Sequence, residues 1–237
     1  MAAKFQFLIT GTDTGVGKTT VACSLATLFR QRGMRVGVMK PAETGCVLRD
    51  GVMTALDAVA LRAAAVSNDT IELICPYRYA TPLAPAAAAV LESREPPDLR
   101  RIAAIYERLA ADRDVMLVEG AGGLAVPITW RENYTDLARL LDLELILVVG
   151  NRLGCINGMV LSLEYAAQRG VRVRGYILND LEAESSPAAQ TNPRSLKSLL
   201  PRRCLGVMRY EHPLPAENRT LTVLISRLWT STHPCLR

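Results

Sequence analysis

Histidine and lysine are both scarce in this sequence, and its cysteines are widely spaced. The histidines are His212 and His233, and none of the six cysteines forms a C-x-x-C pair. A zinc centre, which needs clustered Cys and His ligands, is therefore not expected. The lysines are Lys4, Lys18, Lys40 and Lys197. Because arginine supplies most of the positive charge, each lysine is a candidate for a specific role.

The sequence also lacks any long hydrophobic run. No segment approaches the ~18 consecutive apolar residues that a membrane span requires. The opening segment, MAAKFQFLIT, contains too short an apolar run for a secretion signal. We therefore expect a cytoplasmic protein with free thiols and no membrane partner.

Charge and aromatic content restrict the class of protein further. The formal net charge is +5, but the arginines are scattered and their longest runs are the pairs 100–101 and 202–203. Since no basic patch is interleaved with aromatic residues, we expect no nucleic-acid partner and favour anionic small molecules. Apolar residues make up 49% and aromatic residues 5% of the 237 residues, which predicts an ordered core of Ala, Val, Leu and Ile.

Short apolar runs and helical patterns alternate along the chain. Strands are expected at residues 5–10, 35–39, 71–75, 114–120, 143–150, 171–179 and 203–208. A short helix is expected inside 82–92, and longer helices at 18–32, 54–66, 98–112 and 216–229. The Ser- and Pro-containing segment 182–194 is expected to be a mobile surface loop.

The order of these elements predicts an α/β fold. Continuously apolar strands are typical of parallel strands that are covered on both faces. We expect a single domain over residues 1–237, built as a doubly wound, mostly parallel sheet with helices on both faces. Ligands bind such sheets beyond the carboxyl ends of the strands. Polar loops follow the expected strands at 11–19, 40–45, 119–123 and 151–157.

The first loop, GTDTGVGKTT, predicts a phosphate-binding loop of the P-loop NTPase type. It follows a strand and opens a helix, and Gly17, Lys18 and Thr19 complete the G-x-x-x-x-G-K-[ST] pattern. The opening glycine, Gly11, lies one position early, so a plain glycine turn is the alternative. Gly15 and Gly17 would let backbone N–H groups face an anion. Lys18 would reach the β- and γ-phosphates of a nucleotide, and the Thr19 hydroxyl would bind Mg²⁺.

The next two loops supply a cation and carboxylates. Lys40 of KPAETG ends a strand and can point into the cleft, although a solvated lysine is the alternative. Glu119 of VEGAGGL ends another strand before a glycine-rich turn and is the first candidate for a Mg²⁺ ligand. Asp57 of TALDAVAL is the second candidate, with an ordinary exposed helix carboxylate as its alternative.

The fourth loop, within NRLGCINGMVL, opens a helix. Gly154, Cys155 and Asn157 lie near its start, and a helix capped by Asn157 is the alternative to a binding site. Cys155 is not favoured as a nucleophile, because no histidine lies near it in the sequence.

Together these stretches resemble dethiobiotin synthetase. The resemblance runs through GTDTGVGKT, KPAETG, the Asp of TALDAVAL, VEGAGGLAVP, LVVGNRLGCING and YILND, and so covers most of the chain. This family writes its phosphate loop as G-T-D-T-x-V-G-K-T. The early glycine of the present loop agrees with that variant.

The resemblance implies an ATP- and Mg²⁺-dependent ligase of biotin biosynthesis that acts as a homodimer. Its substrates would be 7,8-diaminopelargonic acid, CO₂ or bicarbonate, and ATP. One amine takes up CO₂ as a carbamate, ATP phosphorylates the carbamate, and the second amine closes the ureido ring of dethiobiotin. The protein would contribute positioning and charge neutralisation, not a covalent nucleophile.

The same resemblance implies roles for individual residues. The catalytic group would be Lys18, Lys40 and Thr14. ATP would be bound by Gly15, Val16, Gly17, Lys18, Thr19, Thr20 and, through its adenine, Asn179. The diamine would contact Thr44, Lys40, Gly122 and, across the dimer, Gly154, Cys155 and Asn157. Mg²⁺ would be bound by Thr19, Asp57 and Glu119.

The sequence departs from the family pattern in four places. Gly15 stands where some members have Glu, and Gly158 where many have His. Ala86 follows PLAP where His is frequent. Arg209 replaces the usual Pro of a G-x-x-P segment near the last strand, which leaves the choice of nucleotide open. None of these changes removes a phosphate or metal ligand.

Two other kinds of protein share this type of loop. Amide-forming synthetases of the cobyrinic acid type usually carry a glutaminase domain, for which 237 residues would leave no room. Partitioning and septum-positioning ATPases usually place a lysine early in the loop, within K-G-G-x-G-K. The corresponding stretch here, TDTGVGK, has no early lysine.

Overall fold

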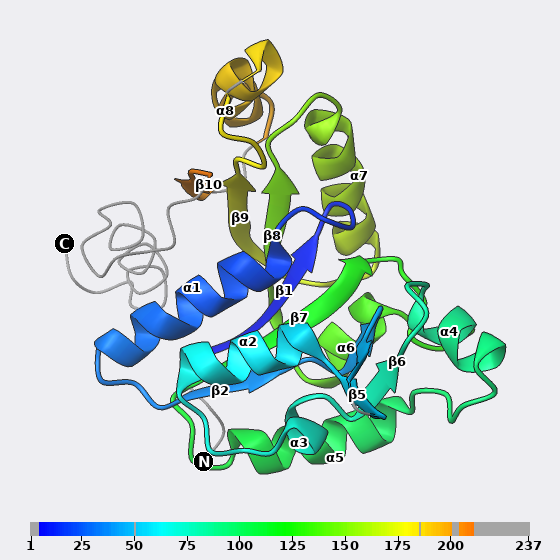
Figure 1. Cartoon of the computed structure of the whole chain (residues 1–237). Helices are drawn as coiled ribbons and strands as arrows, with labels where there is room; N and C mark the ends of the chain where they lie inside the picture. Colours follow the sequence, from blue (N-terminus) through cyan, green and yellow to red (C-terminus); the bar gives the residue numbers. More distant parts are fainter. Residues whose placement is uncertain (1–4, 50, 185, 201–203, 211–237) are drawn as a thin grey trace.

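The computed structural model describes residues 5–49, 51–184, 186–200 and 204–210. The helix expected at 216–229 lies outside these residues. Within them, the central sheet has six strands in the order β10-β9-β8-β1-β7-β2, and neighbouring strands are parallel (Figure 1). In chain order these strands are β1 (Phe5–Gly11), β2 (Val36–Met39), β7 (Val115–Gly123), β8 (Glu144–Gly150), β9 (Val173–Asn179) and β10 (Cys204–Met208).

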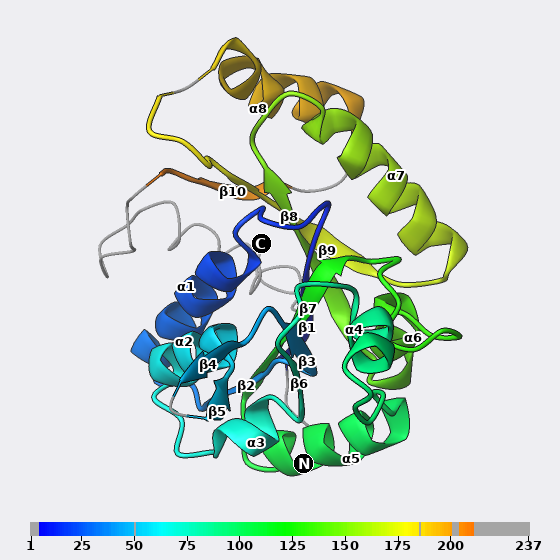
Figure 2. The same cartoon turned by 45° about the vertical axis from the view of Figure 1, so that its right-hand side comes forward.

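Helices pack against both faces of this sheet. They include α1 (Lys18–Gln31), α2 (Leu56–Ala65), α4 (Pro85–Leu91), α5 (Leu99–Ala110), α6 (Tyr134–Leu140) and α7 (Cys155–Gln168). Figures 1 and 2 show α1 and α2 on one face and α4 to α7 on the other. None of the helices in the described part of the chain is long and apolar enough to cross a membrane.

Successive residues of the strands pack into the cores on opposite faces of the sheet. Phe7 and Ile9 of β1 belong to the buried cluster that contains the apolar residues of α1 and α2, whereas Leu8 belongs to the cluster of α5, α6 and α7. Leu117 and Val118 of β7 divide between the clusters in the same way. The doubly wound, parallel α/β fold predicted from the sequence is therefore confirmed.

The parallel arrangement brings the carboxyl ends of four strands together. β1 lies between β7 and β8, with Ile9 opposite Glu119 and Gly11 opposite Val148. β2 pairs with the other side of β7. The loops that follow these strands therefore open at one edge of the sheet, where ligands bind in this class of fold.

Two small sheets lie between the main elements. β3 (Ala42–Thr44) pairs in parallel with β6 (Tyr77–Tyr79), and β4 (Val47–Arg49) forms an antiparallel hairpin with β5 (Val52–Thr54). The sequence does not predict these strands, because three residues are too few for a hydrophobic period to show. β3, β4 and β5 connect β2 to α2 and so carry the second predicted ligand-binding loop.

The strand expected at 71–75 is wrong. Residues Ile71–Ile74 form the short helix α3, and the Thr70 hydroxyl caps it by accepting a hydrogen bond from the Leu73 N–H at 3.4 Å. An apolar run of this length fits a strand and a helical turn equally well. The cap at Thr70 favours the helix.

The loop expected at 182–194 is wrong in its second half. Helix α8 spans Pro187–Leu199, and the Ser186 hydroxyl caps it by accepting a hydrogen bond from the Ala189 N–H at 3.2 Å. Proline is tolerated in the first turn of a helix, since the N–H that it lacks would have no partner there. The Ser-Pro pair therefore begins a helix here and does not extend a loop.

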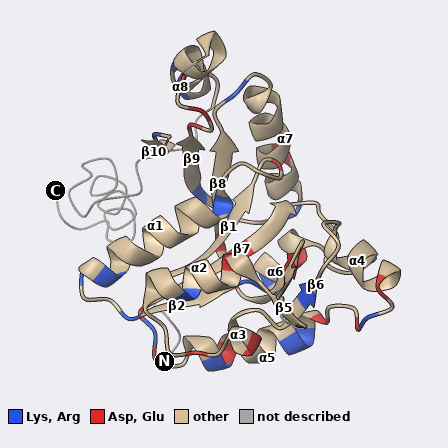
Figure 3. Ribbon diagram, in the orientation of Figure 1, with Lys and Arg blue, Asp and Glu red and all other residues tan. Residues whose placement is uncertain are grey.

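Apolar burial contributes more to stability than surface charge does. Acidic and basic residues both occur in the region of α3 and α5 (Figure 3). Arg101 Nη1 lies 2.9 Å from Glu95 Oε1, and both side chains are exposed. Ion pairs of this kind contribute about 0–1 kcal/mol each.

We expect Leu117→Ala to lower the free energy of unfolding by about 2–5 kcal/mol, because this fully buried side chain of β7 leaves a cavity. Leu199→Ala on α8, where the leucine is 60% exposed, should change it by less than about 0.5 kcal/mol. Urea unfolding followed by circular dichroism measures both variants. Equal losses would contradict the assignment of Leu117 to the core.

Candidate active site

The loop between β1 and α1 has the backbone of an anion-binding turn. Gly17 is the N-cap of α1 with φ 85°, so the free N–H groups of the first helical turn follow it directly. The Lys18 ammonium donates a hydrogen bond to the Asp13 carbonyl at 3.0 Å, and the residue is 8% exposed. Burial, and then the nearby Lys40, lower the pKa of Lys18. A negatively charged ligand beside Lys18 would favour the charged ammonium and so offset both effects on its pKa.

Four side chains from separate segments meet beside this loop. The Lys40 ammonium, directly after β2, donates to Glu119 Oε1 at 2.6 Å and to Asp57 Oδ2 at 2.7 Å. The Thr19 hydroxyl donates to the same Glu119 oxygen at 2.8 Å. The side chains of Lys40 and Glu119 are 3% and 1% exposed. Lys40 is therefore not a solvated lysine, and Asp57 is not an ordinary surface carboxylate.

The charges of this cluster depend on one another. Burial alone would lower the pKa of Lys40, but the Glu119 and Asp57 carboxylates outweigh it and raise that pKa. Burial raises the pKa of Glu119, and Lys40 offsets only part of this effect. Burial would also raise the pKa of Asp57, but Lys40 lowers it below its usual value. The Lys40 ammonium therefore stays charged, and its charge favours the ionised forms of Glu119 and Asp57.

Thr19, Asp57 and Glu119 form a donor set that fits a magnesium ion. The Glu119 Oε2 atom is buried and has no hydrogen-bond partner among the described residues. Buried polar atoms of this kind usually have a partner, which a bound ion or water can supply. Two carboxylates and one hydroxyl are hard oxygen donors, and few enough for Mg²⁺ to keep water and phosphate oxygens as well.

Most of the predicted site residues line one cavity of about 350 Å³ at this edge of the sheet. They are Thr14, Gly15, Gly17, Lys18, Thr19, Thr20, Lys40, Thr44, Asp57, Glu119 and Gly122. Val16 is 1% exposed and belongs to the core beneath the loop. Glu43 also lines the cavity and was not among the residues predicted from the sequence. Its position in KPAETG, between Lys40 and Thr44, was the available signal.

The residues of the fourth loop lie outside this cavity. Gly154 is the N-cap of α7, and Cys155 and Asn157 follow in its first turn, so the alternative of an Asn157 cap is wrong. The start of α7 approaches the phosphate loop, where Arg152 Nη2 lies 2.6 Å from Asp13 Oδ2. Burial raises the pKa of the Cys155 thiol, which makes it a poor nucleophile.

A wider cavity of about 720 Å³ adjoins the first one at Thr14. It is also lined by Thr12 and Asp13, by residues 123–127 at the end of β7, and by one side of α7. Leu161 of α7 lines it and is 61% exposed, and Leu153, just before α7, is 87% exposed. This end of the molecule therefore presents apolar side chains beside an open cavity.

Asn179, the last residue of β9, is hydrogen-bonded to the phosphate loop. Its Nδ2 donates to the Val16 carbonyl at 3.0 Å, and the residue is 7% exposed. A Cβ atom at Gly17 would lie 2.1 Å from the same nitrogen. The side chain predicted to read adenine is therefore already bound to the loop that would hold the phosphates.

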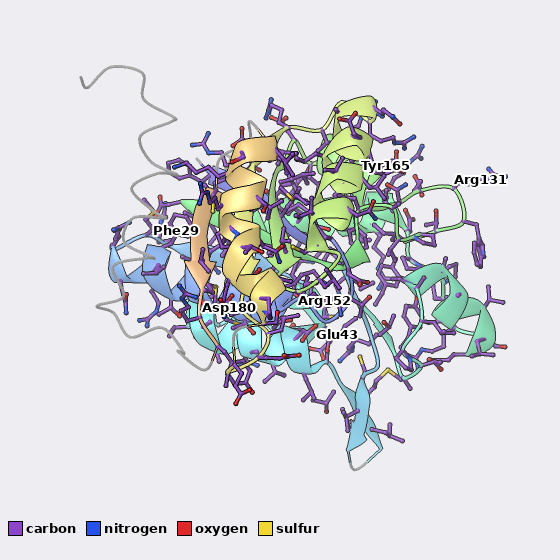
Figure 4. All side chains as sticks on the ribbon, turned by 90° about the horizontal axis from the view of Figure 1, so that it is seen from above. Phe29, Glu43, Arg131, Arg152, Tyr165 and Asp180 are labelled. Atoms are coloured by element: carbon purple, nitrogen blue, oxygen red, sulfur yellow. The ribbon has the colours of Figure 1, made fainter. Side chains whose placement is uncertain are left out.

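A third cavity, of about 730 Å³, opens beyond β8 and β9. Asp180 accepts hydrogen bonds from Asn151 Nδ2 at 2.6 Å and from Arg209 Nη1 at 3.0 Å. Asn151 in turn accepts one from Asn192 of α8 at 3.0 Å. Figure 4 looks onto this end, with Arg152 and Asp180 labelled beside α8. This network was not predicted from the sequence, although Asn151 and Asp180 directly follow two expected strands.

The chain is similar to a family of known enzymes over most of its length. A family model described as an AAA domain matches residues 6–218. A Thermodesulfovibrio yellowstonii protein named ATP-dependent dethiobiotin synthetase BioD is 40% identical over 215 residues, which cover 87% of this chain and 89% of the relative. The protein of that name from Anaeromyxobacter sp. (strain K) is 41% identical over 213 residues, covering 90% of this chain and 93% of the relative.

The same fold occurs in more distant solved structures. The septum site-determining protein MinD of Pyrococcus horikoshii, complexed with Mg-ADP, has a TM-score of 0.57 and 18% identity to this chain. The alignment covers 95% of this chain and 94% of that one. At this level of identity the likeness concerns the fold alone.

We expect Gly17→Ala to lower stability and ATP affinity more than Gly15→Ala does. Both glycines have positive φ, 85° and 73°, so an alanine at either position is strained by about 1 kcal/mol. Only at Gly17 would the new Cβ meet a neighbour, Asn179 Nδ2 at 2.1 Å, whereas nothing lies within 4 Å at Gly15. Thermal unfolding with and without ATP measures both variants. Asn179→Gly should restore part of the loss at Gly17, and equal effects at the two glycines would contradict the contact.

We expect Lys40→Met to lower the free energy of unfolding by about 3–5 kcal/mol near pH 8, because it leaves the buried Glu119 without its cation. The pKa of Glu119 should then rise further, so the folded state binds this proton more readily than the unfolded state. The loss should therefore shrink as the pH falls toward the unfolded-state pKa of about 4.3.

Urea unfolding near pH 8 and near pH 5.5 measures this pH dependence. The matched control is Lys40→Met combined with Glu119→Gln, which removes the titrating group and should abolish the effect. A loss in Lys40→Met that does not change with pH would contradict the pairing.

Proposed function

The chain belongs to the dethiobiotin synthetase family, and we propose that it forms the ureido ring of dethiobiotin from 7,8-diaminopelargonic acid, CO₂ and ATP. The observation that carries this proposal is the cavity of about 350 Å³ where the phosphate loop, two lysines and two candidate metal-binding carboxylates converge. Such a site serves phosphoryl transfer, which depends on positioning and charge neutralisation more than on a covalent protein nucleophile.

The proposed reaction has three steps. One amine of the substrate adds to CO₂, which forms a C–N bond and releases a proton. A carbamate oxygen then attacks the γ-phosphorus of ATP, and the bond to the ADP oxygen breaks. The second amine attacks the carbonyl carbon of the resulting carbamic-phosphoric anhydride. This closes the cyclic urea and expels phosphate.

In this scheme the phosphate loop binds the triphosphate. The backbone N–H groups from Gly15 to Thr20 surround its oxygens, with the N-terminus of α1 adding partial positive charge. The Lys18 ammonium, now on the Asp13 carbonyl, would turn to the transferring phosphoryl group. Thr14 lines both this cavity and the wider one, which supports a role at the boundary between ATP and the diamine.

Lys40 would bind the carbamate and stabilise the charge that develops on its oxygen. Its bonds to Glu119 and Asp57 support this role, because they keep the ammonium charged and directed into the cavity. Thr44 and Gly122 line the same space and would contact the diamine. Carbamate formation and phosphorylation would then take place within reach of one lysine.

Thr19, Asp57 and Glu119 would bind Mg²⁺. The ion would neutralise charge on the phosphate oxygens when ATP is bound. The buried, unpartnered Glu119 Oε2 and the donor set of hard oxygens support this assignment.

The diamine would also contact a second subunit. Gly154, Cys155 and Asn157 lie outside the first cavity at the start of α7, where they would bind the substrate carboxylate of a partner protomer. The exposed Leu153 and Leu161 support a homodimer in which this end of α7 is covered.

The adenine base would bind beyond β9, in reach of Asn179. Guanine presents two neighbouring N–H donors, which a free carboxylate matches. Asp180 is not free for this, since it accepts hydrogen bonds from Asn151 and Arg209. Arg209, which replaces the family's usual Pro, occupies one oxygen of Asp180, so this carboxylate is not available to guanine. The contact therefore favours ATP over GTP.

We expect ADP release from ATP and Mg²⁺ to require both the diamine and bicarbonate, and to yield a cyclic urea identified by mass spectrometry. Lys40→Ala should lower turnover by about 10²–10³-fold, because the charge that develops on the carbamate loses its cation. Leu199→Ala, at an exposed position that lines none of the three cavities, should keep full activity. Slow hydrolysis that ignores the diamine would overturn the proposal and favour a switch ATPase, for which DNA and lipid vesicles would be tested next.

We expect Lys40→Ala and Asn157→Asp to complement each other in mixed dimers. Asn157→Asp places a carboxylate against the carboxylate of the substrate, so each variant alone should be inactive. If each site takes Lys40 from one subunit and Asn157 from the other, half of the randomly mixed dimers regain one intact site, or about a quarter of wild-type activity. Differently tagged subunits verify the exchange. Verified exchange without recovery would place the whole site within one chain.

A further inference from the structure

Glu43 is a buried carboxylate at the active site for which the proposed reaction gives no role. It lies in β3, between Lys40 and Thr44 in the sequence, and is 5% exposed. It lines the cavity of about 350 Å³ together with both lysines. Figure 4 labels it at the base of the β4–β5 hairpin. Acidic side chains are almost never buried to this extent without specific partners.

The partners of Glu43 are the first N–H groups of α2. Its Oε1 accepts from the Asp57 N–H and its Oε2 from the Ala58 N–H, both at 3.0 Å. The N-cap residue of α2 is Ala55, which has no side-chain oxygen to offer. Glu43 therefore caps α2 from a different strand, and its charge lies at the positive end of the helix.

This cap fixes the residue that would bind the metal. The backbone N–H of Asp57 is bound by Glu43, while its Oδ2 accepts a hydrogen bond from Lys40 at 2.7 Å. Lys40 and Glu43 are only three residues apart, so one short segment holds Asp57 at both its main chain and its side chain. The Asp57 side chain is 39% exposed and packing alone would leave it free to turn.

We propose that Glu43 is a positioning residue for the magnesium site, which acts by fixing the first turn of α2 and thereby the carboxylate of Asp57. The inference rests on the proposed function, since it takes Asp57 as a metal ligand. Both oxygens of Glu43 face N–H donors of α2, which favours this role over direct contact with the metal or the diamine. Residues that orient a metal ligand typically change metal affinity about 10–100-fold when they are removed.

The test measures Mn²⁺ binding directly, by electron paramagnetic resonance in the presence of ADP. Glu43→Ala should weaken Mn²⁺ binding about tenfold. It should raise the Mg²⁺ concentration for half-maximal turnover by a similar factor, with kcat restored at saturating Mg²⁺. Glu43→Gln keeps one acceptor oxygen, so its effect should lie between those of wild type and Glu43→Ala. If Glu43→Ala folds poorly, Glu43→Gln still tests the proposal, because it should bind Mn²⁺ more weakly than wild type does.

Two further variants separate the possible outcomes. Asp98→Ala removes the cap of α5, where Asp98 accepts from the Arg100 N–H at 2.8 Å, and should lower stability without changing Mn²⁺ binding. Asp57→Asn should weaken Mn²⁺ binding if Asp57 is a ligand. If it does not, the metal assignment of Asp57 in the proposed function is wrong, and the role proposed for Glu43 is overturned with it.

The proposal is overturned if folded Glu43→Ala or Glu43→Gln binds Mn²⁺ as tightly as wild type while Asp57→Asn does not. It is also overturned if kcat falls and excess Mg²⁺ does not restore it, because Glu43 would then contact reacting groups. Mn²⁺ binding needs no diamine, so this result does not depend on whether the cyclic urea is formed.

Discussion

The buried ammonium of Lys40 is the constraint around which the carboxyl edge of the sheet is organised. A charge taken out of water costs several kcal/mol and is tolerated only where opposite charges and hydrogen bonds surround it. Lys40 follows β2, Glu119 lies in β7 and Asp57 begins α2, so three separate segments must meet before this cation can be buried. Because β7 also pairs with β1, the same contacts place the cluster next to the phosphate loop.

Elements that depend on residues close together in the sequence could be predicted from it. Contacts between segments far apart in the sequence could not. The six strands of the main sheet are mostly apolar, and glycines mark the phosphate loop, so both follow from local pattern. Residues Ile71–Ile74 form a helix that is capped at Thr70, a weaker signal in the sequence than the apolar run itself. In the sequence Glu43 is one carboxylate among many. Its partner α2 begins thirteen residues later, and only the placement of β3 brings the two together.

The fold and the chemistry of the site have different origins. The same fold also occurs in MinD of Pyrococcus horikoshii, at 18% identity. That similarity covers nearly the whole chain, so the fold by itself does not select a reaction. In the proposed function, the selection would lie in the loops after β2 and β7, where Lys40 and Glu119 join Thr19 of the phosphate loop.

Charge at the cavity links metal binding to substrate binding in the proposed reaction. Three carboxylates (Glu43, Asp57, Glu119) face two ammonium groups (Lys18, Lys40), which leaves one negative charge in excess before any phosphate enters. ATP would add to this excess, so a divalent cation on Asp57 and Glu119 is needed to offset the repulsion. Those carboxylates are the same groups that now hold Lys40. A metal ion that took over their oxygens would weaken the hold on Lys40 and would leave its ammonium available for the carbamate. In the proposed reaction, this competition for two carboxylates would favour carbamate binding once the metal and the nucleotide were in place.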